Sequence, residues 1–209
     1  MLFRSLQGLI SAVQTDVEHR DARERTARDL SSSLPANGTP QKLANGTRVS
    51  TTAPGSTHEQ YTVTLDVLDD GAVRLFVGCV GVADNFNGVA FTRVWTEFIC
   101  SSVRDVVVLT KHLCRATGFR GSWDFGVGLT GMLGAHPAPT TAGPQVMSPL
   151  GSAYTEGSYR NTTRATSEEC SLSPGTVVNR LTSRLLSGLG AFGHAMPLRS
   201  APESALAGQ

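Results

Sequence analysis

The stretch GSWDFGVGLTGM, residues 121–132, contains two patterns that predict different structures. Apolar residues at 123, 125, 127 and 129 alternate with polar residues or glycine, which is the period of a half-buried β-strand. Residues 126–131 also fit G-x-G-x-x-G, a fingerprint of dinucleotide sites. A working fingerprint opens a helix, but the prolines in LGAHPAP, residues 133–139, exclude a helix here. The stretch therefore predicts a strand with no cofactor, and a nucleotide-dependent activity at 126–134 ranks last among the hypotheses.

Residues 59–192, which include this strand, predict one folded domain. YTVTLDVL (61–68) alternates like a strand, DDG (69–71) predicts a hairpin turn, and 73–79 predict the returning strand. A long helix is expected over 90–117, with Gly118 as its C-terminal cap, and loops over 81–88 and 136–150. A strand over 159–166, a capping box at Thr166 and Glu169, and a helix beginning at Ser173-Pro174 complete the domain. This order, β-β-α-β-β-α, predicts an α+β two-layer sandwich with a four-stranded antiparallel sheet and two main helices.

Three further segments flank the domain. Residues 1–30 predict an amphipathic helix whose apolar stripe packs on the domain or forms a short coiled coil. Residues 31–58 repeat ANGT and are rich in proline and glycine, which predicts a disordered linker. Residues 193–209 predict a disordered tail.

Composition excludes several classes of function. Lys and Arg number 18 and Asp and Glu 17, so net charge gives no overall attraction to nucleic acid or membrane. No apolar run reaches 18 residues, so no membrane span or membrane partner is expected. The four cysteines lack metal-ligand spacing and predict reduced core thiols in a cytoplasmic protein. No nucleophile and base stand at a recognisable spacing, so no catalytic residue, cofactor or metal is expected, and an enzyme is disfavoured.

Two surfaces are candidates for binding. The first belongs to an interaction module that binds a protein partner or self-associates, with the contacts Leu2, Leu6, Leu9, Ile10, Val13, Gly126 and Gly128. The glycines belong to this set because glycine in a strand often marks the close approach of another backbone. The alternative is a nucleic-acid-binding accessory protein whose arginine-bearing sheet face would grip phosphates, with the contacts Arg74, Arg160, Arg164, Arg180 and Arg184.

Three stretches together carry a resemblance: GSWDFGVGLTGM (121–132), YRNTTRAT (159–166) and VVNRLTSRLL (177–186). They resemble the C-terminal module of actinobacterial proteins described as DNA-binding or ATP-binding, many of which begin with a Schlafen AlbA-type domain. The resemblance covers residues 60–192 and implies an actinobacterial cytoplasmic protein with a sheet-and-helix body. It carries over no catalytic residue. The DNA-binding description belongs to the N-terminal domain, which the sequence lacks, so a free-standing module or a piece of a split gene is expected.

Overall fold

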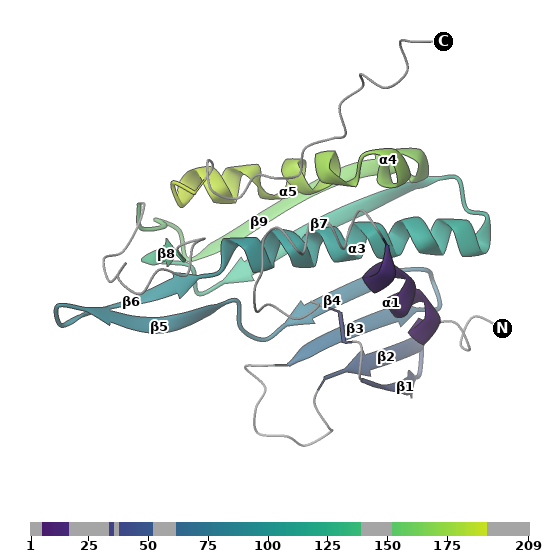
Figure 1. Ribbon diagram of the computed structural model, residues 1–209, viewed down its shortest axis with the longest axis horizontal. Helices are drawn as coiled ribbons and strands as arrows, with labels where there is room; N and C mark the ends of the chain where they lie inside the picture. Colours follow the sequence, from purple (N-terminus) through teal and green to yellow (C-terminus); the bar gives the residue numbers. More distant parts are fainter. Residues whose placement is uncertain (1–5, 17–33, 36–37, 52–61, 139–151, 192–209) are drawn as a thin grey trace, which may run out of the picture.

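The computed structural model describes residues 6–16, 34–35, 38–51, 62–138 and 152–191 (Figure 1). The helices are α1 (Leu6–Thr15), α3 (Thr96–Thr117), α4 (Ser167–Leu172) and α5 (Pro174–Gly188). The strands are β1 (Thr39–Leu43), β2 (Gly46–Ser50), β3 (Val63–Leu68), β4 (Val73–Val77), β5 (Gly81–Phe86), β6 (Val89–Val94), β7 (Ser122–Thr130), β8 (Ala135–Pro137) and β9 (Ser158–Thr166). The chain is therefore α+β, as predicted.

The strands form three sheets rather than the single one predicted. A four-stranded antiparallel sheet has the order β1-β2-β3-β4, and β7 pairs with β9 in a separate antiparallel pair. β5 and β6 form an antiparallel hairpin, and β8 adds to β6 in parallel. The alternating segments predicted as strands are thus confirmed as β3, β4, β7 and β9, but β4 and β7 belong to different sheets.

The predicted linker over residues 31–58 is wrong in part, because β1 and β2 lie within it. Ala44 and Asn45 form the two-residue turn of a hairpin in which Leu43 pairs with Gly46. The hairpin is ordered by its neighbour β3: Val49 is fully buried opposite Leu65. Tertiary burial therefore overrides a composition that resembles a linker. Residues 52–58 of the predicted linker, and the predicted tail from 193 onward, lie outside the described residues.

The predicted loop over 81–88 and the predicted start of the long helix at Ala90 are also wrong. Residues 81–94 form the β5–β6 hairpin, and α3 begins only at Thr96. Asn87 and Gly88 form the turn with φ of 51° and 82°. Positive φ at both central residues is the condition for the hairpin turn that Asn-Gly favours. The hairpin extends beyond the other strands in Figure 1.

The other helix boundaries follow the predicted capping residues. Gly118 ends α3 in the left-handed conformation, with φ of 72°. The Thr166 side chain accepts a hydrogen bond from the Glu169 amide at the start of α4, and Pro174 occupies the first turn of α5. Gly190, with φ of 65°, follows the end of α5.

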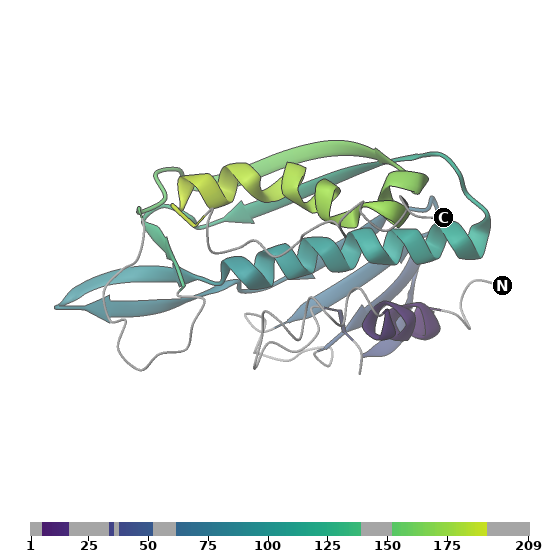
Figure 2. The same ribbon diagram turned by 45° about the horizontal axis from the view of Figure 1, so that its top comes forward.

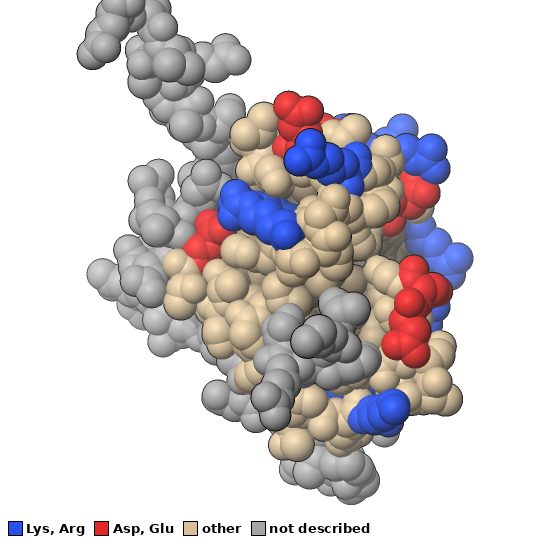
Figure 3. Space-filling model, turned by 90° about the vertical axis from the view of Figure 1, so that its right-hand side faces the viewer, with Lys and Arg blue, Asp and Glu red and all other residues tan. Residues whose placement is uncertain are grey.

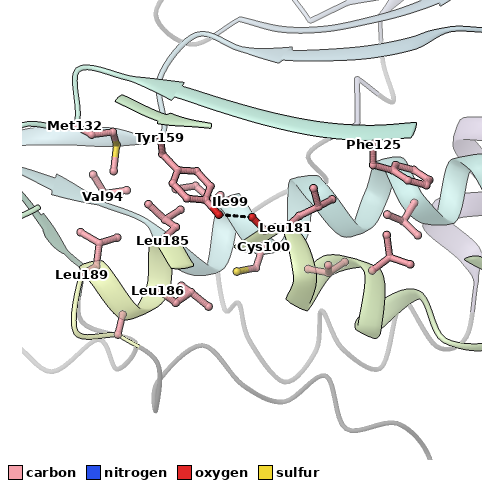
Figure 4. Packing of buried hydrophobic residues seen from close by; sticks show 14 of the residues in the cluster. Val94, Ile99, Cys100, Phe125, Met132, Tyr159, Leu181, Leu185, Leu186 and Leu189 are labelled. Atoms are coloured by element: carbon pink, nitrogen blue, oxygen red, sulfur yellow. Dashed lines mark hydrogen bonds between the residues drawn. The ribbon is translucent and has the colours of Figure 1, made fainter. Parts of the chain in front are cut away.

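α3 is the central helix, and a hydrophobic cluster lies on each side of it (Figure 2). The first cluster joins α3 to α5, β7 and β9. In Figure 4, the Tyr159 hydroxyl donates a hydrogen bond to the Leu181 carbonyl inside this cluster. Cys100, Cys114 and Cys170 are buried free thiols, and burial raises the pKa of Cys100 and of Cys170 to about 11. Three of the four cysteines are therefore core thiols, as predicted, whereas Cys79, also expected in the core, is only half-buried.

The second cluster contains the apolar stripe of α1. Leu6, Ile10 and Val13 are buried there against residues of α3, β2 and β3, and Leu9 packs against the same cluster. Asp16 follows the helix and lies 3.3 Å from Lys111 Nζ and 3.4 Å from His112 Nε2. Burial lowers the pKa of His112.

The partner contact predicted for this stripe is therefore wrong for Leu6, Ile10 and Val13. Their side chains are buried in the core of the same chain and offer no surface to a partner. Leu2 and residues 17–30 lie outside the described residues.

Candidate functional site: a slot between two strand edges

The glycine-rich stretch lies along β7 and not in a turn from strand to helix. Gly126 and Gly128 are strand residues, Gly131 follows the strand with φ of 69°, and the next described element is β8. The helix N-terminus that would hold a pyrophosphate is therefore not formed after the motif. The glycines instead form one wall of a cavity.

This cavity, here called the slot, separates β4 from β7. Its volume is about 670 Å³, within the range of ordinary ligand pockets. Residues 73–81 form one wall and 125–132 the other. The floor is apolar and comes mainly from α3, through Ile99, Val103 and Val106, with Leu181 of α5. Both walls are strand edges, since β4 pairs only with β3 and β7 only with β9 among the described strands.

The hydrogen bonds of β4 define which of its backbone groups face the slot. Gly78 donates to the Thr62 carbonyl and Leu68 donates to the Ala72 carbonyl, at the two ends of the β3–β4 ladder. Because hydrogen-bonded pairs alternate along an antiparallel ladder, the even-numbered residues of β4 bond to β3. The N–H and C=O groups of residues 73, 75 and 77 therefore point away from β3, toward the slot.

On β7 the same alternation directs the backbone groups of the glycines toward the slot. Ser167 donates to the Gly121 carbonyl, so the odd-numbered residues of β7 bond to β9. The N–H and C=O groups of residues 124, 126, 128 and 130 then point toward the slot. A Cβ built at Gly128 meets nothing within 4 Å, and one at Gly126 meets only ordinary contacts. The backbone of β7 is therefore open to the close approach of another backbone at these glycines.

The slot-facing N–H and C=O groups of the two edges belong to residues on opposite faces, which is the arrangement that one inserted strand requires. On β4 the slot-facing groups belong to residues whose side chains point inward to the core, namely Val73, Leu75 and Val77. On β7 they belong to residues on the exposed, outward face. A central strand bonds to its two neighbours through alternate residues, so its inward residues would bond to β4 and its outward residues to β7.

The direction of the walls is also consistent with an inserted strand. Val80, just beyond β4, accepts a hydrogen bond from Trp95 at the start of α3, and Thr92 pairs with Ala135 beyond the end of β7. Both strands thus end near the start of α3 and run in the same direction (Figure 1). One strand running opposite to both would continue the antiparallel pairing that each sheet already has.

The outward rim of the slot is the surface that the sequence partly identified. Arg74 and Phe76 lie at exposed positions of β4, and Phe76 retains 62% of its surface. Across the slot, Arg160 of β9 lies opposite Gly128 in the β7–β9 register. Gly126, Gly128 and Arg74, all predicted from sequence, therefore line the same slot, and Arg160 lies one strand behind Gly128. Sequence reasoning missed the apolar floor residues, because an apolar helix face has the same pattern whether it is covered or open.

Two of the remaining three arginines of the predicted nucleic-acid surface are paired with carboxylates, and the third lies on a helix. Arg164 makes two hydrogen bonds to Asp124, at 2.7 and 2.9 Å, and this contact lowers the pKa of Asp124. Arg180 pairs with Glu169 and also donates to the Arg164 carbonyl. Arg184 is exposed on α5, on the helical side of β9. The five arginines do not form one basic surface, and Figure 3 shows acidic and basic side chains interspersed over one end of the molecule.

Comparisons with known proteins add no relative. A scan against protein-family models, a comparison with curated proteins and a comparison with solved structures found no match. Among the described residues, no group of three or more His, Cys, Asp or Glu side chains could hold a metal ion, and no helix is long and apolar enough to cross a membrane. The slot is therefore the feature of the described structure that bears on function.

Proposed function

We propose that this protein is an interaction module that binds an extended segment of a partner protein, which enters the slot as an additional β-strand. One observation carries the proposal: two strand edges that no other described strand pairs with face each other across a slot with an apolar floor, and their backbone groups alternate as a single inserted strand needs. This mode of recognition takes its affinity from main-chain hydrogen bonds and its specificity from pockets for alternate side chains.

When the slot is empty, the backbone groups that face it have no hydrogen-bonding strand among the described residues. An exposed strand edge is a template for pairing with another chain, and proteins usually cover or charge such edges. Here the covering groups are missing on both sides of the slot within the described residues, while the floor below is apolar. Each hydrogen bond formed to an incoming strand contributes about 0.5–1.5 kcal/mol net. Burial of aliphatic side chains against Ile99 and Val103 adds about 25 cal/mol per Å².

A protein partner is favoured over nucleic acid for a chemical reason. The groups presented to the slot are backbone amides and carbonyls in strand spacing, which complement another backbone and not a row of phosphates. Two of the five arginines proposed for phosphate contact already have carboxylate partners. An interaction module remains the proposed class, as expected from sequence; of the partner contacts expected from sequence, Gly126 and Gly128 are kept and the α1 stripe is not.

Cys79 allows a direct test, because it lines the slot and is only half-buried, whereas the other three cysteines are buried. The test peptide is a neutral heptapeptide of alternating threonine and valine. We expect it to slow alkylation of Cys79 by N-ethylmaleimide in a saturable manner, followed by mass spectrometry. The control is the same peptide with alternate amides N-methylated, which removes donors and should give no protection.

Two outcomes would contradict the proposal. The first is an alkylation rate of Cys79 that does not change at millimolar peptide. The second is equal protection by the N-methylated peptide, since that would show binding independent of main-chain hydrogen bonds. Salt-sensitive binding of DNA or RNA oligonucleotides, together with no peptide protection, would favour the nucleic-acid alternative instead.

A further inference from the structure

We infer that the segment bound in the slot alternates acidic and aliphatic residues, with the acidic side chains facing outward. The inference rests on the proposed function, since it specifies the chemistry of the strand that the slot accepts. Two sets of residues carry it: the floor beneath the slot and the arginines on its outer rim.

The chemistry of the floor determines which side chains the segment can place inward. Ile99, Val103 and Val106 of α3 present only hydrocarbon, and the Ser102 hydroxyl among them already donates to the Phe98 carbonyl. Phe125 and Leu181 extend the apolar surface on the β7 side. A polar or charged side chain placed here would be desolvated with no partner. The inward positions of the segment are therefore aliphatic.

The charge of the outer rim determines which side chains are favoured at the outward positions of the segment. Arg74 on β4 and Arg160 on β9 have no ion pair within the described part of the chain. Two other arginines on these sheets do have carboxylate partners: Arg48 pairs with Asp66 at 2.7 Å, and Arg164 pairs with Asp124 at the same distance. Arg74 is also the only charged residue that lines the slot in the described structure.

The two arginines stand on opposite sides of the slot. Arg74 lies on the strand that the segment would pair with directly, at a spacing of about 4.8 Å between strands. Arg160 lies one strand further away, but Gly128 stands between it and the slot and has no side chain to block it. Arg74 thus lies beside the outward positions of the segment, Arg160 lies beyond Gly128 on the other side, and their positive charge favours acidic outward residues.

The test compares three peptides with valine at every inward position and glutamate, glutamine or lysine at every outward position. Protection of Cys79 from alkylation gives the affinity of each peptide. Opposite charges on neighbouring strands strengthen pairing by up to about 5-fold per pair. We therefore expect the glutamate peptide to bind about 10-fold tighter than the glutamine peptide at low salt, and the lysine peptide to bind weakest. The difference should shrink as salt rises.

Variants assign the effect to the two arginines. Arg74→Gln combined with Arg160→Glu should remove the preference for glutamate and favour lysine, while Arg184→Glu on the exposed face of α5 should leave the order unchanged. Equal binding of all three peptides, or a preference for lysine in the natural chain, would overturn the inference and leave the strand-binding function standing. No protection by any of the three would overturn the proposed function itself.

Discussion

Replacing Gly128 by proline is expected to weaken binding of an extended peptide by about 1–3 kcal/mol. The Gly128 amide points into the slot, so proline removes a donor and leaves a carbonyl of the bound strand without a partner. The fold should survive, because the hydrogen bonds between β7 and β9 are made by the odd-numbered neighbours, such as Val127, and proline is tolerated on strand edges. Titration of the peptide against Cys79 alkylation measures the change.

Gly128→Ala is the matched control for this prediction. Alanine retains the amide, and its Cβ meets nothing within 4 Å, so binding within about 3-fold of the natural chain is expected. Thermal unfolding of both variants would separate a binding defect from a folding defect. If proline and alanine at position 128 bound the peptide equally well, the Gly128 amide would not contact the occupant, and the proposed pairing with β7 would be wrong.

The second large effect concerns α1. Ile10→Ala should lower the free energy of unfolding by about 2–5 kcal/mol, because the Ile10 side chain is completely buried in the cluster with Leu109 and Val49. Urea unfolding followed by circular dichroism measures this loss. Ser11→Ala, at the exposed neighbouring position, is the control and should change stability by less than about 0.5 kcal/mol.

The same variant distinguishes the two interpretations of the apolar stripe. Light scattering with size-exclusion chromatography should give the same molar mass for the natural chain and for Ile10→Ala at equal concentration. If Ile10→Ala instead dissociated an oligomer and left the unfolding free energy of the monomer unchanged, the stripe would be an interface between chains rather than part of the core.

Local patterns predicted the elements whose stability is mostly local. The alternation of 61–68 and 123–130 identified β3 and β7, and Gly118 marked the end of α3. The hairpin of β5 and β6 also has a local signal in Asn87-Gly88, but the short apolar run after it fits a helix as well as a strand. β1 and β2 had no comparable pattern, since their order depends on burial of Val49 against a distant strand.

The site was predictable only in fragments. In the sequence, Gly126 and Gly128 indicate the close approach of another backbone, and the strand alternation predicts a common outward face for Arg74 and Arg160. That Gly126, Gly128 and Arg74 line one slot depends on which strands lie side by side, and packing on α3 determines this, not local sequence. The stripe of α1 illustrates the same limit, because an apolar helix face has one pattern whether it packs within the chain or against another.

Amide hydrogen exchange on the unliganded protein is the most direct test of the open slot. The amides of Leu75, Val77, Gly126 and Gly128 point into the slot, whereas those of Phe76 and Val127 bond to neighbouring strands. We expect fast exchange for the first group, slow exchange for the second, and slow exchange for both once the glutamate–valine peptide is bound. Equal protection of the two groups in the free protein would mean that the edges are already paired, and it would contradict the account.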